Sequence, residues 1–434
     1  MTPNPGIMRA VEQLGYRVTV GDVASQAGLD VKIAERELLA LSAEAGGHLQ
    51  VSESGEIAYL FQRNFRDVIR NKYFKLRLQE SWSRIWGVLF YLIRVSFGIL
   101  IIASIVLMLL AVIVISIALS SSRGDNDSRD DGGMVFMPNL WVGDWFWIFT
   151  PGYRDDRSHE KKRRLSNGDR QMNFLEAVFS FLFGDGNPNA DLEERRWKSI
   201  ATVIRNNGGA VVAEQIAPYL DDLGTGFKQE YEDYMLPVLT RFNGRPEVSP
   251  EGQIVYYFPE LQVTARQSKT QALAAYLKEL PYRFSQASSG QKVIAAGLGG
   301  VNLVLALVLW SLLRDGTIAA QLGGLVAFVS GIFPVLLGYG LGFVAIPLIR
   351  YFWIQQRNRK IEARNEKRQQ YAVILNESNP VLQHKLTFAH QFAATTVVDE
   401  KDLAYSTETD LTEQELLRSD KIDAEWERRL ESGS

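Results

Sequence analysis

Residues 51–61 read VSESGEIAYLF, and residues 248–258 read VSPEGQIVYYF. The two stretches align without a gap and are identical at six of eleven positions. In both, a glycine stands at a turn and apolar residues alternate after it, which is the pattern of a hairpin with one buried face. A long apolar run follows each stretch. The sequence therefore indicates an internally duplicated membrane protein, in which a small soluble module precedes membrane-embedded helix twice.

The residues before each hairpin are expected to be helical. Residues 21–29, GDVASQAGL, are typical of the first helix and tight turn of a helix-turn-helix, with Gly28 at the turn. Asp30 is expected to cap a third helix over 31–45. With the hairpin as its wing, residues 1–61 resemble a winged helix, and residues 194–260 repeat this plan. The predicted fold class is mainly α: two winged-helix-like α/β modules plus transmembrane helices.

Three apolar runs follow the modules, at 86–120, 293–313 and 318–349. About 20 helical residues cross a bilayer core, so the middle run suits one span and the outer two exceed it. Glycines and prolines make a break in the last run credible. Basic residues flank the first and last runs, which favours the cytoplasmic or stromal face for both flanks. We expect the first run to turn back, giving two paired hairpins; three simple crossings are the alternative.

These patterns divide the chain into seven parts. In order, they are module 1 (1–61), a basic helix with the first membrane segment (62–120), a linker with aromatic interfacial segments (121–193), module 2 (194–260), a connecting helix (261–292), a transmembrane hairpin (293–349), and a cytoplasmic helix with an acidic tail (350–434).

Two groups of residues are candidates for contact with partners. Aromatic residues suit the headgroup layer and protein interfaces, and the candidate interaction residues are Trp141, Trp145, Trp147 and Trp426. Basic residues next to apolar runs set topology and attract anionic lipid. The candidate lipid-facing basic residues are Arg70, Lys72, Lys75, Arg359 and Lys360.

Composition excludes several kinds of site. The chain has no cysteine and four histidines, so disulfides, thiolate metal sites and cysteine-held iron–sulfur clusters are excluded. Residues 185–191 mimic the start of a calcium loop but lack its glycine and bidentate glutamate, which favours a plain Asx-rich turn. No catalytic set, cofactor motif or signal peptide is recognised, so the first module is expected to stay where it is synthesised.

Other polar residues have plain interpretations. The third helix of module 1 carries Lys32 and Arg36 against three glutamates, so protein contact is favoured over DNA contact. Arg94 is expected to snorkel to the membrane interface, with a functional intramembrane charge as the alternative. Asn302, Gln321 and Tyr339 are too scattered to indicate a transport path.

Residues 173–189, NFLEAVFSFLFGDGNPN, are the most specific stretch of a wider resemblance. Here the chain resembles an uncharacterised family of membrane proteins shared by cyanobacteria and plant chloroplasts, and the resemblance covers most of the chain. Some plant members carry a label of iron–sulfur cluster biosynthesis, which the absence of cysteine does not support. The resemblance implies a cyanobacterial source and the thylakoid or plasma membrane, and it supplies no catalytic residues.

The sequence thus predicts an integral membrane scaffold or assembly factor that is not an enzyme and binds no cofactor. Its expected partners are the membrane, other membrane or peripheral proteins, and anionic lipids. A membrane-tethered DNA-binding regulator and a small transporter subunit are the alternatives, although nucleic acid is disfavoured. The oligomeric state is left open.

Overall fold

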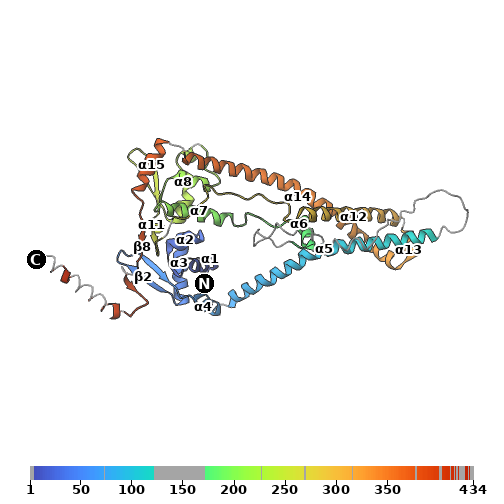
Figure 1. Ribbon diagram of the computed structural model, residues 1–434, viewed down its shortest axis with the longest axis horizontal. Coiled ribbons are helices and arrows are strands. Elements are labelled where there is room, and N and C mark those ends of the chain that lie inside the picture. The colour runs from blue at the N-terminus through green and yellow to red at the C-terminus, as the bar shows by residue number, and fades with distance from the viewer. Residues whose placement is uncertain are drawn as a thin grey trace, which may run out of the picture. The chain divides into compact units, whose positions relative to one another are not determined.

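The computed structural model describes most of the chain, as two compact units. It describes residues 4–72, 74–121, 172–225, 227–267, 270–314, 316–376, 379–399, 403–410, 412–414, 416, 419, 426–428 and 430. Unit 1 comprises Met1–Trp82, Pro188–Pro281 and Lys360–Ser434, and unit 2 comprises Ser83–Asn187 and Tyr282–Arg359. Figure 1 labels their elements.

The first half of unit 1 follows the predicted order of helices and hairpin. Its elements are α1 (Pro5–Gln13), β1 (Arg17–Thr19), α2 (Val20–Ala27), α3 (Val31–Ala45), β2 (His48–Ser52), β3 (Ile57–Leu60) and α4 (Phe65–Lys72). Local signals set these bounds. Gly28 adopts the left-handed conformation after α2 (φ 64°), and the Asp30 carboxylate accepts the amide of Lys32 at the start of α3.

The second half repeats the hairpin and surrounds it with shorter helices. Its elements are α7 (Leu192–Asn206), β4 (Ala210–Val211), α8 (Ala213–Ile216), the 3₁₀ turn η2 (Ala217–Tyr219), α9 (Phe227–Glu230), η3 (Asp233–Met235), α10 (Leu236–Phe242), β5 (Arg245–Val248) and β6 (Ile254–Tyr257). The strands of the two halves have the same order, β1-β3-β2 and β4-β6-β5, and all neighbours are antiparallel. The two predicted hairpins are therefore confirmed.

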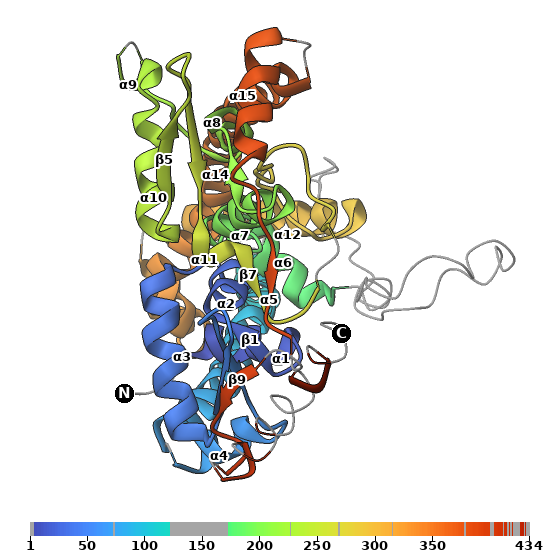
Figure 2. The ribbon, with the colours of Figure 1, turned by 90° about the vertical axis from the view of Figure 1, so that its left-hand side faces the viewer.

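The chain beyond residue 360 adds a strand to the first sheet and forms a separate two-stranded sheet with β7, which the sequence did not indicate. After α15 (Pro380–His390), β8 (Thr396–Val397) pairs with β7 (Val263–Thr264), and β9 (Leu403–Ser406) pairs with β2. Figure 2 shows β9 beside the first sheet and α15 beside the second. The first sheet thus has four strands, of which one comes from near the end of the chain.

The predicted connecting helix at 261–292 is wrong over most of its length. Of the residues described in this range, only those in α11 (Pro259–Gln262) and at the start of α12 are helical, and residues 270–288 run as an irregular strap. Side chains of other elements bind the strap's backbone. Asn365 binds both the amide and the carbonyl of Glu279 at 2.9 Å, and Asn206 binds those of Gln271. These bonds replace the helical ones, so tertiary contacts override the local preference.

Unit 2 is built from apolar helices, and among the residues that the structure describes, three helices are long and apolar enough to cross a membrane. The helices are α5 (Phe74–Ser121, which begins in unit 1), α6 (Phe174–Phe183), α12 (Ser289–Leu313), α13 (Thr317–Leu322) and α14 (Gly324–Asn376, which ends in unit 1). The candidate spans are Arg84–Ser120, Ser289–Leu313 and Gly324–Leu375.

Two expectations about breaks in the apolar runs are corrected. The run at 86–120 does not turn back, because α5 is one uninterrupted helix. Gly98 instead permits close packing of α6, since a Cβ there would lie 2.8 Å from the Cα of Leu175. In the last run, the break falls at Gly323 and Gly324, both at positive φ, and Pro334 lies inside α14.

Candidate functional site

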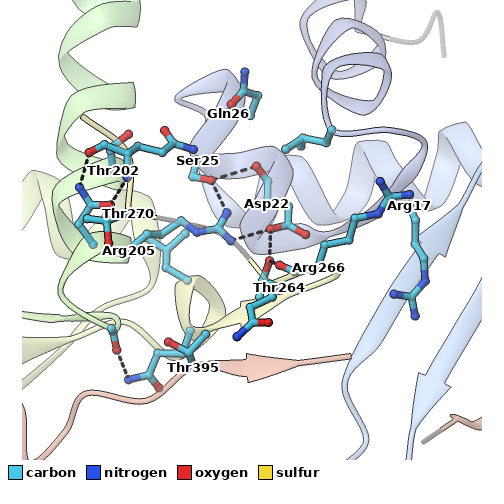
Figure 3. A pocket seen from close by; sticks show the side chains of 17 residues that line it. Arg17, Asp22, Ser25, Gln26, Thr202, Arg205, Thr264, Arg266, Thr270 and Thr395 are labelled. Carbon is cyan, nitrogen blue, oxygen red and sulfur yellow. Dashed lines mark hydrogen bonds and ion pairs between the residues drawn. The ribbon is translucent and has the colours of Figure 1, made fainter. Parts of the chain in front are cut away.

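Asp22 in α2 joins the two halves of unit 1. One carboxylate oxygen accepts the amides of Thr19 and Ala265, at 3.0 and 2.8 Å. The other accepts the guanidinium of Arg205 in α7 at 2.7 Å and lies 2.9 Å from the hydroxyl of Thr264 (Figure 3). Only 5% of Asp22 is exposed. A buried carboxylate with this many donors is well compensated, so removing one partner would be costly.

Backbone also approaches backbone closely at this junction. A Cβ on Gly21 would lie 2.0 Å from the carbonyl oxygen of Glu260. At the other end of α2, the carbonyl of Gly28 accepts two N–H groups of Arg241, at 2.6 and 3.1 Å. The Arg241 guanidinium stacks 4.3 Å from the ring centre of Trp197, and burial lowers the pKa of Arg241. The two halves therefore share one packed core rather than being joined by a flexible tether.

The exposed side of α3 mixes apolar and charged groups. Ile33 and Leu39 are 42% and 51% exposed. Lys32, Glu35 and Arg36 are also exposed, so charges of both signs stand beside the apolar groups. Protein interfaces have this composition, whereas a phosphate-binding helix requires a basic excess.

The corresponding region of the second half also exposes apolar side chains. Leu236 at the start of α10, Tyr231 before it and Val248 at the end of β5 are 59%, 65% and 62% exposed. Pro237 lies in the first turn of α10, which is a favourable position for a proline.

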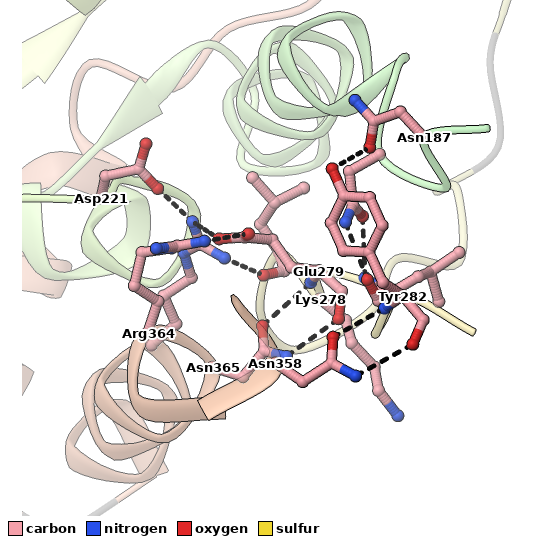
Figure 4. Close-up of polar contacts among 12 residues, drawn as sticks. Asn187, Asp221, Lys278, Glu279, Tyr282, Asn358, Arg364 and Asn365 are labelled. Atoms are coloured by element: carbon pink, nitrogen blue, oxygen red, sulfur yellow. Dashed lines mark hydrogen bonds and ion pairs between the residues drawn. The ribbon is translucent and has the colours of Figure 1, made fainter. Parts of the chain in front are cut away.

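A network of charges holds the strap in unit 1 (Figure 4). Glu279 accepts Arg364 at 2.6 and 2.7 Å and Arg368 at 2.9 Å. Arg368, which is 1% exposed, also binds Asp221. Burial would raise the pKa of Glu279, but hydrogen bonds from Arg364 and the charge of Arg368 lower it below its ordinary value. We assign this cluster a structural role, because its groups are saturated by one another.

In unit 2, polar groups link the apolar helices. Arg94 lies 3.8 Å from Asp185 and over the rings of Phe90 and Phe179, so its charge has a partner inside the unit in addition to any snorkelling. The hydroxyl of Ser104 donates to Asn302 at 2.8 Å. These contacts join the apolar helices to neighbouring segments and do not outline a transport path.

The stretch that resembles a calcium loop is bound by protein groups. Asp185 accepts the hydroxyl of Ser180 and the amide of Gln286, both at 2.7 Å. In unit 2, Asn187 accepts the hydroxyl of Tyr282 at 2.7 Å, and in unit 1, Asn189 binds the backbone of Leu280. This supports the interpretation as an Asx-rich turn. Among the described residues, no group of three or more histidines or acidic residues could hold a metal ion.

The structure describes only some of the predicted contact residues. Trp141, Trp145 and Trp147 lie outside the described residues, and Trp426 is 63% exposed. Of the basic residues, Lys72, Arg359 and Lys360 are exposed, Arg70 is paired with Asp67 at 3.5 Å, and the side chain of Lys75 is not described. Sequence reasoning missed Asp22 and Arg241. The spacing of Thr19 and Asp22, a capping box, was the available signal for Asp22.

No protein-family profile and no solved structure matches this sequence. The chain is similar to a protein of Arabidopsis thaliana named "Uncharacterized protein At5g03900, chloroplastic". The two are 38% identical over 442 residues, which cover 98% of this chain and 81% of the plant protein. The similarity therefore extends over both units.

Proposed function

Because this chain belongs to the same family as that chloroplastic plant protein, we propose that it is a membrane-anchored scaffold that holds other proteins at a photosynthetic membrane. The family and the three apolar helices are compatible with a protein of chloroplast-type membranes. In the proposal, the two halves of unit 1 are winged-helix-like modules that bind protein, and the chain has no catalytic activity of its own.

The exposed face of α3 is the observation that carries this proposal. Two apolar side chains, Ile33 and Leu39, face solvent among charges of both signs. Exposed apolar groups inside a polar rim favour a protein partner. The rigid junction at Asp22 supports the same idea, since a scaffold must hold its contact surfaces in fixed positions.

The pairing of β9 with β2 supports a common side for the soluble parts. Strands cannot pair across a bilayer, so in the proposal residues 48–52 and 403–406 lie on the same face of the membrane. Basic flanks favour the cytoplasmic or stromal face for this unit.

The test is affinity purification of the full chain from native membranes in mild detergent, with quantitative mass spectrometry. We expect Ile33→Glu combined with Leu39→Glu to remove co-purifying proteins that the unchanged chain retains. Val381→Glu is the matched control, because Val381 is 59% exposed on α15, away from α3. Equal recovery of partners by both variants would contradict the proposal. Salt-dependent retention of the full chain on DNA would instead favour the alternative function, a membrane-tethered DNA-binding regulator.

A further inference from the structure

Unit 1 contains a cavity of about 360 Å³ where its two halves meet. It is bordered by α2, by α7 and by residues 261–267 and 270–271, with Thr395 at one side (Figure 3). Its volume lies at the lower end of the range of roughly 300–1,000 Å³ that is usual for small-molecule sites. It can therefore hold a small metabolite.

The charged groups that line this cavity are mainly cationic. The positively charged residues are Arg17, Arg205 and Arg266, and the negatively charged residue is Asp22. Arg17 is 5% exposed, and its guanidinium donates to the carbonyls of Ala265 and Val398. Three guanidinium groups against one carboxylate give the lining an excess of positive charge, although the whole chain has a net charge of −3. The charge of the cavity lining is thus opposite in sign to the net charge of the whole chain.

The hydrogen-bonding capacity of the lining also favours an anion. Asp22, the acidic residue of the lining, already receives two amides and a guanidinium N–H. A guanidinium carries five N–H donors. Arg205 donates one N–H to Asp22 and one to the hydroxyl of Ser25, and Arg266 donates one to the carbonyl of Gly15 at 3.2 Å. Hydroxyls of Thr270 and Thr395 add groups that can donate or accept, and the hydroxyl of Thr202, which donates to the carbonyl of Lys198 at 2.8 Å, can still accept.

We propose that this cavity binds a small phosphate-bearing metabolite. Arg205 and Arg266 would contact the phosphate, because planar guanidinium groups match phosphate oxygens and keep their charge at every physiological pH. The threonine and glutamine side chains would bind the remaining polar groups. Both halves of unit 1 line the cavity, so a ligand would link them and stabilise the junction that Asp22 forms.

The test measures binding to the full chain in detergent by isothermal titration calorimetry. The probes are glycerol 3-phosphate and inorganic phosphate, with glycerol as the uncharged comparison. We expect saturable binding of at least one phosphate probe and none of glycerol. Arg266→Gln should weaken that binding about tenfold or more, which is the effect of losing one charge-assisted hydrogen bond. Arg36→Gln, which removes an exposed arginine of α3, should leave it unchanged.

Thr270→Val is a second variant in case Arg266→Gln fails to fold, because Thr270 is exposed and lines the cavity. It should weaken binding without lowering the melting temperature. The proposal is overturned if neither phosphate probe binds saturably. It is also overturned if both cavity variants fold and bind as the unchanged chain does, or if Arg36→Gln has the same effect as Arg266→Gln.

Discussion

Ser52 and Ser249 occupy the same position in two separate hairpin turns. The amide of Gly55 donates to the carbonyl of Ser52 at 2.9 Å, and the amide of Gly252 donates to the carbonyl of Ser249 at 2.9 Å. Each serine hydroxyl also accepts the amide four residues later, at 3.1 and 3.2 Å. The repeated sequence therefore forms the same individual hydrogen bonds in both hairpins. The helices around the two hairpins resemble each other only in their general arrangement.

Gly21→Ala should disrupt the junction of the two halves of unit 1. The added Cβ would lie 2.0 Å from the carbonyl oxygen of Glu260, and this contact is with backbone that cannot rotate away. Overpacking of this kind costs about 1–3 kcal/mol or more. We expect a lower melting temperature for the full chain. Gly290→Ala is the control, since a Cβ there meets nothing within 4 Å and alanine favours the helix; equal melting temperatures for the two variants would contradict the model of the junction.

The stability of unit 1 should fall in acid. The pKa values of Asp221 and Glu279 lie below their ordinary values of 3.8 and 4.5, so both carboxylates add stability above those values. This contribution is lost as the pH falls below about 4.5 and through the lowered pKa values. Thermal melts between pH 7 and pH 3 should show the loss.

Glu279→Gln identifies the group responsible for part of this loss. It should flatten the acid side of the melting profile and also lower stability at pH 7, because the buried Arg368 loses a charged partner. Breaking a buried pair costs about 3–5 kcal/mol. Glu362→Gln, at an exposed position of α14, should change neither quantity. An acid limb identical to that of the unchanged chain would rule out Glu279 as its source.

Ser104 and Asn302 should be energetically coupled. Their hydrogen bond, at 2.8 Å, joins α5 to α12 where Asn302 is fully buried. Interhelical bonds between membrane helices contribute roughly 0.6–1.7 kcal/mol. A double-mutant cycle of Ser104→Ala and Asn302→Ala in detergent should return a coupling energy in this range. Strictly additive effects of the two substitutions would show that the bond contributes nothing.

The turns of both hairpins and the residues after β9 should share one side of the membrane. The chain has no cysteine, so single substitutions Glu53→Cys, Glu251→Cys and Glu408→Cys can be labelled without background. A membrane-impermeant maleimide applied to sealed vesicles should label all three or none. Labelling of positions 53 and 408 from opposite sides would refute the pairing of β2 with β9. Labelling of position 251 from the side opposite to position 53 would refute the junction of the two halves of unit 1.

Local signals made the hairpins and the cap of α3 predictable from the sequence. The glycines at 55 and 252 and the alternation after them act within a few residues of each other. The strap was not predictable, because residues 270–280 have a helix-like composition and the groups that hold them, Asn206 and Asn365, are distant in sequence. The close approach of α6 to Gly98 was not predictable for a similar reason, because Leu175 lies far along the chain.

The candidate site was even harder to predict from the sequence. Asp22 was visible as part of a helix start, but the residues that make it a junction, Arg205 and Thr264, belong to the second half of unit 1. Pairing of this kind has no periodicity in sequence. The exposed face of α3 was anticipated in its charge balance, while its apolar members became evident only from their exposure.

The addition of β9 to the first sheet sets an order of assembly. During synthesis, β2 keeps an open edge until translation has passed Ser406, by which time the three candidate spans of the described residues have already been synthesised. The earliest domain to emerge is thus the last to be completed. A truncated product would carry an unprotected strand, which would mark it for aggregation or degradation.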